Sequence, residues 1–394
     1  MNICFSDRVN TLKASEIREL LKFAENPEII SFAGGLPCPE LFPVEELQTI
    51  VQQVLKTDGR AALQYGPTEG IHSLREIIAK QRMKPANVDV TADNITITAG
   101  SQQGIEFSGK IFLNKGDVVI CESPSYLGAL NAFQAYMPKF VAIQMDDNGM
   151  IIDDVEKALK QYPNAKMIYT IPDFQNPTGI TMSDDRRKRL AELGAKYQIP
   201  IIEDNPYGDL IYEGTRHPSI KSFDKEGWVI YLGTFSKTFC PGLRLGWICA
   251  SNEILQKYII VKQGADLQCG SLDQRIAALF METYDLNVHI EKLKNLYGVR
   301  RNLMIESMDK YFPVGVKHTN PNGGLFTWFE VKEGLDTAEI LKEALKENVA
   351  YVPGSSFFPG GGHHNFARLN YSCMGEEKIV EGIKRLGNVL KKYY

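Results

Sequence analysis

Lys237 and Arg244 stand close together in the segment GTFSKTFCPGLRLGW, residues 233–247. A lysine amine can bond covalently to an aldehyde, and an arginine can bind two oxygens of one phosphate at once. The five residues before this segment, WVIYL, are apolar and rich in β-forming types, which predicts a strand that ends inside the molecule. Two charged side chains at the end of a core strand need a chemical reason, because an unpaired charge is costly to bury.

Two further predicted strands are also followed by groups that could bind a ligand. The strand 94–98 leads into AGSQQG, where Ser101 and Gln102 open a helix whose free N–H groups suit a phosphate. This stretch could also be no more than a tight turn. The strand 166–170 leads to Asn176, which could bind a ligand or simply form a turn with the proline after it. Each feature alone therefore has a purely structural explanation.

A carboxylate follows the strand 199–203. Asp204 comes directly after it, with Tyr207 close behind, and such an aspartate is more commonly a helix cap. Together, however, the four strand ends offer a phosphate-suited turn, an amide, a carboxylate with a tyrosine, and a lysine with an arginine. A cofactor with a phosphate, a cationic ring nitrogen, a phenolic oxygen and an aldehyde would use them all. Pyridoxal 5′-phosphate has this structure, and a lysine Schiff base with an aspartate on the ring nitrogen is its usual protein signature.

The elements that must position these residues alternate along the chain. From about residue 94 to residue 250, short apolar strands are spaced by amphipathic helices, one of them expected over 184–197. Strands buried on both faces and separated by helices indicate an α/β fold with a mostly parallel, doubly wound sheet. Ligands bind at the carboxyl ends of the strands in such a sheet, which is where the candidate residues fall.

The two ends of the chain differ from this central region. A segment rich in glycine and proline, 32–43, separates an N-terminal arm from it. A long helical stretch, about 273–311, leads to a C-terminal α+β section that ends in an amphipathic helix from Glu376. We predict a large domain over 45–289 and a smaller α+β domain built from both chain ends, 1–44 and 290–394.

Composition limits the class of protein. The 394 residues are 44% hydrophobic and 23% charged, as in an ordinary globular protein, and the net charge of −4 argues against a nucleic-acid surface. No apolar run approaches the ~18 residues needed to span a bilayer, and no signal peptide is visible at the start. Seven scattered cysteines without CxxC or CxxH spacing fit reduced thiols better than a disulfide framework or a metal site. We expect a cytoplasmic protein with no metal, no membrane and no nucleic acid among its partners.

The chain resembles a fold-type I pyridoxal-phosphate aminotransferase over nearly its whole length. The resemblance rests on Ser236-Lys237 followed by PGLRLG, on NPTG at 176–179 and on DNPY at 204–207. A closer likeness, to the branch with 2-aminoadipate and kynurenine aminotransferases, rests on KASEIREL at 13–20, ISFAGGLP at 30–37 and YGP at 65–67.

This resemblance implies a role for each candidate residue. Lys237 would carry the cofactor and later move a proton between the substrate Cα and the cofactor. Asp204 would keep the ring nitrogen protonated, while Tyr207 and Asn176 would bond the phenolic oxygen. The phosphate would be held by Ser101, Gln102, Ser236 and Arg244, with Thr234 as a possible addition.

Five further residues complete the expected site. Tyr126 follows the predicted strand 117–120 and either stacks on the cofactor ring or packs in the core. By resemblance, Tyr65 reaches the phosphate of a neighbouring subunit, so the active site would need a homodimer. Arg368 lies within the apolar segment FARLNY and needs an anion: either an internal carboxylate or, by resemblance, the substrate α-carboxylate with Gly35 beside it. Arg18 would read the distal end of the substrate.

The expected activity is transfer of an amino group from an L-amino acid to a 2-oxo acid, 2-oxoglutarate or pyruvate, in two half-reactions. The alternatives are a lyase or synthase on the same fold, and a regulator that fuses an aminotransferase-like domain to a DNA-binding domain. The regulator would need a substantial basic domain ahead of Gly34, where few residues stand. The sequence does not identify the amino donor.

Overall fold

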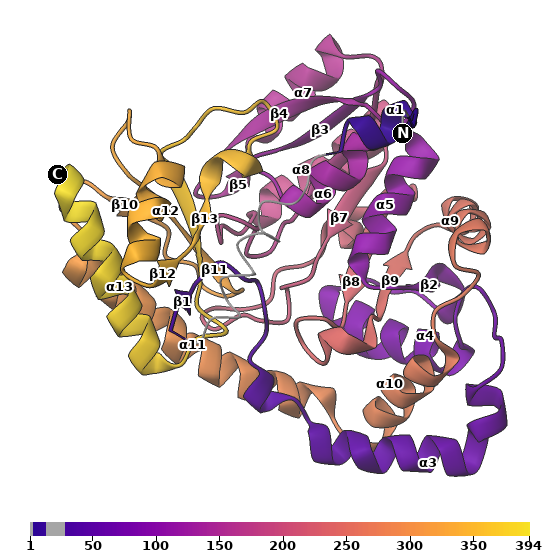
Figure 1. Ribbon diagram of the computed structural model, residues 1–394. Helices are drawn as coiled ribbons and strands as arrows, with labels where there is room; N and C mark the ends of the chain where they lie inside the picture. Colours follow the sequence, from indigo (N-terminus) through magenta and orange to yellow (C-terminus); the bar gives the residue numbers. More distant parts are fainter. Residues whose placement is uncertain (1–2, 13–27) are drawn as a thin grey trace.

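The computed structural model describes residues 3–12 and 28–394. Its largest sheet has eight strands and lies at the centre of the molecule (Figure 1). All five strands predicted in this region are present, with their ends displaced by a few residues at most. In spatial order the strands are β2 (Ile95–Thr98), β9 (Gly246–Cys249), β8 (Val229–Thr234), β7 (Ile201–Asp204), β6 (Ala165–Thr170), β3 (Val118–Ser123), β4 (Lys139–Asp146) and β5 (Gly149–Met150).

Strand direction brings the candidate residues to one edge. The strands β4, β3, β6, β7 and β8 are parallel to one another, which confirms the mostly parallel α/β sheet. Two strands are reversed: β9 lies antiparallel between β8 and β2, and β5 is antiparallel to β4. Since β2 thus runs in the same direction as β8, the carboxyl ends of β2, β6, β7 and β8 meet at the same edge of the sheet.

Alternate residues of the strands pack into hydrophobic layers on opposite faces. Val119 and Met167 belong to one layer, whereas Ile120 and Ile168 belong to the other. This two-sided burial explains why the strands are apolar throughout rather than alternating. The first layer is covered by α5 (Ser101–Phe112), α6 (Leu127–Gln134) and α9 (Asn252–Ala265), and the second by α7 (Ile152–Gln161) and α8 (Asp184–Tyr197). The helix predicted over 184–197 is confirmed as α8.

Three more helices cover the end of the sheet formed by β2 and β9. Ile97 of β2 and Trp247 of β9 share a hydrophobic core with them. The helices are α3 (Val44–Ala62), α4 (His72–Ile78) and α10 (Ser271–Thr283), and a short α1 (Asp7–Asn10) precedes them in the chain.

A second, antiparallel sheet forms most of the C-terminal section. Its strands are β10 (Lys317–His318), β11 (Phe326–Glu330), β14 (Phe366–Asn370) and β13 (Val352–Pro353), packed with α11 (Leu286–Tyr311), α12 (Thr337–Lys346) and α13 (Glu376–Leu390). N-terminal residues join the same core: β1 (Ile30–Ser31) pairs in parallel with β12 (Val349–Ala350), and Phe32 is fully buried there. In Figure 1 the indigo β1 accordingly lies among the orange and yellow C-terminal elements. The proposed domain boundaries themselves stay a prediction.

The single helical stretch expected over about 273–311 is wrong in one respect. It consists of two helices, α10 and α11, separated at Tyr284 and Asp285, which have extended backbones. The side chain of Asp285 caps α11 by accepting a hydrogen bond from the N–H of Asn287 at 2.9 Å. The longer α11 then continues from the core beside α10 to that of the C-terminal section, where Met304 and Met308 are buried.

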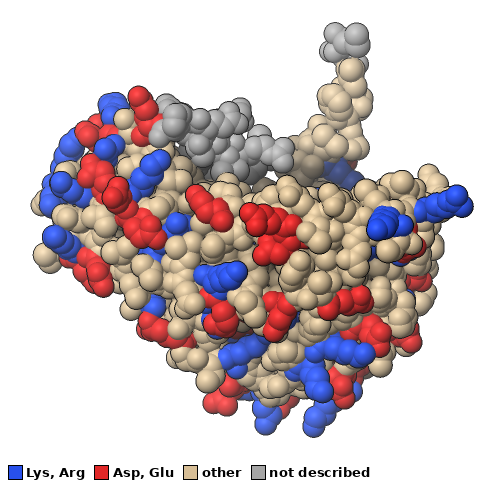
Figure 2. Space-filling view, turned by 90° about the horizontal axis from the view of Figure 1, so that it is seen from below, with Lys and Arg blue, Asp and Glu red and all other residues tan. Residues whose placement is uncertain are grey.

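The surface mixes charges of both signs. On the face shown in Figure 2, Lys and Arg are interspersed with Asp and Glu rather than gathered in one patch. Among the residues that the structure describes, no helix has the length and apolar character required to cross a membrane.

Candidate active site

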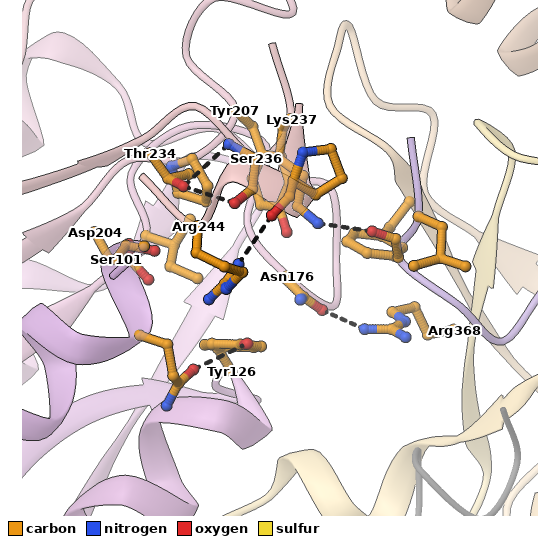
Figure 3. Close-up of a pocket in the computed structure, with 18 residues that line it drawn as sticks. Ser101, Tyr126, Asn176, Asp204, Tyr207, Thr234, Ser236, Lys237, Arg244 and Arg368 are labelled. Atoms are coloured by element: carbon orange, nitrogen blue, oxygen red, sulfur yellow. Dashed lines mark hydrogen bonds between the residues drawn. The ribbon is translucent and has the colours of Figure 1, made fainter. Parts of the chain in front are cut away.

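A pocket of about 350 Å³ opens at the carboxyl edge of the large sheet, where β14 of the second sheet approaches it (Figure 3). It brings together residues that stand far apart in the sequence, from Gly35 to Arg368. The residues predicted for the site that line it are Gly35, Ser101, Gln102, Tyr126, Asn176, Asp204, Tyr207, Thr234, Ser236, Lys237, Arg244 and Arg368.

Lys237 follows β8 and projects into this pocket. Its Nζ donates a hydrogen bond to the carbonyl oxygen of Gly35 at 2.7 Å. Burial, with the positive charges of Arg368 and Arg244, lowers the pKa of Lys237 to about 8. A neutral amine is therefore accessible near pH 7, as a lysine needs if it is to bond to a carbonyl carbon.

Asp204, the last residue of β7, is buried, and only one of its two carboxylate oxygens has a hydrogen-bond partner among the described residues. Its Oδ2 accepts a hydrogen bond from the hydroxyl of Tyr169 at 2.8 Å. Its Oδ1 is also buried but has no hydrogen-bond partner among the described residues. Burial raises the pKa of Asp204 to about 7, against the opposing effect of the Tyr169 hydrogen bond. A protonated ring nitrogen would supply the missing donor, so this site fits a pyridoxal ring.

The turn between β2 and α5 fits a phosphate. Gly100 has a φ of +74°, a backbone conformation that favours glycine, and the tip of the Arg244 side chain lies directly beside it. Arg244 donates to the carbonyl of Ala99 at 3.2 Å. Helix α5 begins at Ser101 without a side-chain cap; the N–H of Gln103 donates to the carbonyl of Gly100 at 3.3 Å, which leaves the N–H groups of Ser101 and Gln102 to bind a ligand. Thr234 donates to Ser236 Oγ at 3.0 Å beside this turn. A guanidinium, hydroxyls and free N–H groups thus converge.

Arg368 enters from the middle of the second sheet, where β14 pairs with both β11 and β13. Its Nη1 donates to Asn176 Oδ1 at 2.8 Å, and its Nη2 donates to the carbonyl of Ala33 at 2.7 Å. The guanidinium lies 4.2 Å from the ring centre of Phe326. Burial lowers the pKa of Arg368 to about 10. Among the residues described, no carboxylate lies within salt-bridge distance, so an internal ion pair does not account for this buried charge.

Three predicted residues need separate comment. Tyr126 lines the pocket and donates to Gln102 Oε1 at 3.3 Å, next to the phosphate-suited turn. Tyr65 does not line the pocket; it is 77% exposed. Arg18 and the segment KASEIREL lie outside the described residues.

Two sets of residues that support the site residues through hydrogen bonds were not predicted from the sequence. Tyr169 is one, and a signal existed: a tyrosine within a fully buried strand needs a partner for its hydroxyl. A second group centres on Asp173, whose carboxylate accepts hydrogen bonds from Arg187 at 2.7 Å and from Asn205 at 2.6 Å. Because Asp173 and Asn205 lie in the loops that carry Asn176 and Tyr207, this contact ties the two loops together.

Comparison with known proteins identifies the class. The family model for aminotransferase class I and II matches residues 36–386. The chain therefore belongs to the class I and II aminotransferases, and the resemblance inferred from its motifs is confirmed.

Individual relatives agree over the full length. The chain is 46% identical over 392 residues to aromatic-amino-acid aminotransferase 1 of Thermococcus litoralis, covering 98% of this chain and 94% of the relative. Kynurenine aminotransferase of Pyrococcus horikoshii, solved with PMP, KYN and KYA, matches with a TM-score of 0.94 at 42% identity, covering 99% and 97% of the two chains. The alpha-aminoadipate aminotransferase of Thermus thermophilus, solved with N-(5′-phosphopyridoxyl)-L-leucine, matches with a TM-score of 0.92 at 39% identity, covering 98% and 97%.

These findings establish the general activity. The protein is an aminotransferase of the fold-type I class, it uses pyridoxal phosphate, and it acts on amino acids. The expectations of fold, enzyme class and cofactor are confirmed, and the lyase and regulator alternatives are not favoured.

Proposed function

We propose that the pocket around Lys237 moves an amino group from an L-amino acid to a 2-oxo acid, 2-oxoglutarate or pyruvate, in two successive half-reactions. The observation that carries this proposal is Arg368, a buried cation without a carboxylate partner among the described residues. Amino donor and 2-oxo acceptor both have a carboxylate beside the reacting carbon. One arginine can therefore orient both, in turn, with its two-nitrogen fork.

When bound, pyridoxal phosphate supplies the aldehyde that takes up the amino group and the ring that withdraws electrons from the substrate Cα. Lys237 would hold this group covalently and would move the proton at Cα through its neutral amine. Asp204 would keep the ring nitrogen protonated with Oδ1. Tyr207 and Asn176 would donate to the phenolic oxygen. The phosphate would be held by Ser101, Gln102, Ser236, Arg244 and the first N–H groups of α5, with Thr234 supporting Ser236.

The active unit we propose is a homodimer. Tyr65 would reach the phosphate bound by the partner subunit, which is consistent with its exposure of 77% and with Leu63 beside it at 74%. The loop is tied to the rest of its own subunit by Ser271, whose hydroxyl donates to the carbonyl of Gln64 at 2.9 Å. A cytoplasmic location stays a prediction, supported by seven free cysteines.

The names of the relatives above refer to aromatic amino acids, kynurenine and aminoadipate, so the identity of the amino donor is tested with a panel. A panel of acidic, aromatic, branched and long aliphatic donors should be assayed with 2-oxoglutarate or pyruvate, and again without acceptor. Sustained keto-acid formation should require the acceptor. Formation that continues without it would contradict transamination.

Covalent attachment tests the assignment of Lys237. Borohydride reduction of the loaded enzyme and peptide mapping should place the pyridoxyl group on Lys237. Lys262 is the natural control, because it is also buried but is engaged by Asp266 and Gln103. Lys237→Ala should lose the covalent link yet retain some bound cofactor through the phosphate contacts. A pyridoxyl group on Lys262 or Lys257 would overturn the assignment.

A further inference from the structure

A buried glutamate lies behind the pocket and has no part in the roles assigned above. Glu122, near the end of β3, is only 1% exposed. Its Oε1 accepts a hydrogen bond from the Thr170 hydroxyl. Its Oε2 accepts from the N–H of Ile171 at 3.3 Å and from Nε2 of Gln175 at 3.1 Å. Burial raises the pKa of Glu122 to about 7, against the opposing effect of these hydrogen bonds.

Gln175 connects this carboxyl to two loops at once. Its Nε2 also donates to the carbonyl of Pro124 at 2.8 Å. Its Oε1 accepts from the N–H and the hydroxyl of Thr178, at 3.0 and 2.8 Å. All the polar atoms of the Gln175 side chain are therefore used, and its orientation is fixed by contacts on both sides.

Both loops deliver residues to the pocket. Pro124 lies in the loop that ends at Tyr126, and Gln175 directly precedes Asn176. Because Asn176 Oδ1 accepts from Arg368, its amide NH₂ is its donor group; the NH₂ also interacts with the Tyr207 hydroxyl, and its second hydrogen can point toward a ligand. A small rotation of the Gln175 backbone would misdirect that donor.

We propose that Glu122 is a positioning residue for the active site: acting through Gln175, it fixes the direction in which the Asn176 amide donates. This inference rests on the proposed contact of Asn176 with the phenolic oxygen of the cofactor. It concerns a residue that touches neither cofactor nor substrate, and it predicts a change in the electronic state of the bound cofactor rather than only in stability.

That state can be measured as the pKa of the nitrogen that links Lys237 to the light-absorbing cofactor, here called the chromophore pKa. A donor on the phenolic oxygen stabilises its negative charge and so favours loss of the proton from the linking nitrogen. Asn176→Ala should therefore raise this pKa, by about one unit for one charge-assisted hydrogen bond. Glu122→Met removes all three acceptor contacts at similar volume and should raise the pKa in the same direction. In the Asn176→Ala background, Glu122→Met should produce no further rise.

Glu203 offers a matched control. It is a second fully buried glutamate, on β7 of the same sheet and separated from β3 by β6. It too accepts from one hydroxyl, that of Ser219, and from backbone N–H groups, those of Ile220 and Lys221. These partners lie away from the pocket. Glu203→Met should lower the melting temperature of the cofactor-free protein about as much as Glu122→Met, but it should leave the chromophore pKa unchanged.

Two conservative variants sharpen the test. Glu122→Gln retains an acceptor for Gln175 and should restore the wild-type pKa. If Glu122→Met does not fold, Gln175→Met breaks the same link from the other end and should show the same rise. An unchanged pKa in Glu122→Met together with a raised pKa in Asn176→Ala would overturn the inference alone. An unchanged pKa in Asn176→Ala would overturn the proposed contact of Asn176 and, with it, the inference.

Discussion

At the scale of single residues, burial shifts three functional groups away from their usual ionisation. It lowers the pKa of Lys237 to about 8 and that of Arg368 to about 10, and it raises that of Asp204 to about 7. Each group lacks a partner among the described residues. Lys237 can bond to a carbonyl carbon, Arg368 can bind a carboxylate, and Asp204 can accept a hydrogen bond from a protonated ring nitrogen. A pocket arranged in this way is complementary to substrate and cofactor together.

The raised pKa of Asp204 makes stability depend on pH in the cofactor-free protein. A folded-state pKa above the ordinary 3.8 means that the folded protein holds this proton more tightly than the unfolded chain does. The stabilisation that this group contributes should therefore be fully present below about pH 4 and be lost as pH rises to about 7, by at most about 1.4 kcal/mol per pH unit. Glu122, whose pKa also lies at about 7, adds an effect of the same sign.

Urea unfolding of the cofactor-free protein between pH 4.5 and 8 measures how steeply the free energy of unfolding changes with pH, which we call the slope. Asp204→Asn should make the slope shallower without abolishing it, since Glu122 still titrates. The stabilisation given by saturating pyridoxal phosphate should also increase with pH in the wild type. An identical slope in Asp204→Asn would contradict the assignment of the titration.

Arg368→Lys keeps the positive charge but loses the two-nitrogen fork. We expect kcat/KM to fall by about 10- to 100-fold for both donor and acceptor, with little change in melting temperature. Arg301 provides the control: it is equally buried but is paired with Glu213 and Asn320, so Arg301→Lys should affect stability and not kcat/KM. A large loss of stability with unaltered kinetics in Arg368→Lys would show that the arginine is structural.

At the scale of elements, the strands only bring the loops to one edge, and buried polar contacts then hold the loops in place. The ion pair between Arg187 of α8 and Asp173 is the main example, with side-chain exposures of 0% and 7%. Arg187 also donates to the carbonyls of Met182 and Pro172, at 2.9 and 3.0 Å. Helix α8 is thereby joined to the loop that carries Asn176.

Removing one partner of this pair should leave a buried charge uncompensated. Asp173→Ala should destabilise the protein by about 3–5 kcal/mol. The same helix offers an exposed control: Arg189 pairs with Asp153, and these side chains are 50% and 68% exposed. Asp153→Ala should cost far less than Asp173→Ala, because solvent screens an exposed ion pair. Chemical denaturation of both variants measures the difference, and similar values for the two would show that burial does not govern the Asp173 contact.

At the scale of the whole molecule, the pocket lies between the large sheet, built from the middle of the chain, and the second sheet, built from its C-terminal part. The long helix α11 connects the cores on either side (Figure 1), so cofactor and substrate contacts from the two parts can act together. In the proposed homodimer, the exposed loop that carries Tyr65 would add a cofactor contact from a second subunit.

Dilution tests the dimer. Sedimentation should show a dimer, and activity per subunit should fall at concentrations where it dissociates. Tyr65→Phe should weaken cofactor affinity by about tenfold, as expected for one lost hydrogen bond to a phosphate. Tyr394→Phe, a change at another exposed tyrosine, should have no such effect. A monomer with full activity would contradict the proposed contact across subunits.

The sequence by itself determined the strands of the large sheet, helix α8 and the chemical groups that follow each strand. These features are local: apolar runs, caps and turns are encoded in neighbouring residues, and parallel strands place their carboxyl ends together. Lys237, Asp204 and Asn176 could therefore be predicted to meet. Tyr65 and Arg368, by contrast, were expected near the cofactor only through a family resemblance.

Only the tertiary structure decided which partner each buried polar group finds. Arg368 meets Asn176 across 192 positions of sequence, and Asp204 meets Tyr169 because adjacent parallel strands set their register. Such contacts arise from the packing of distant elements and from the need to satisfy buried donors and acceptors. No local periodicity encodes them, because the same side chains would be equally compatible with other partners in another fold.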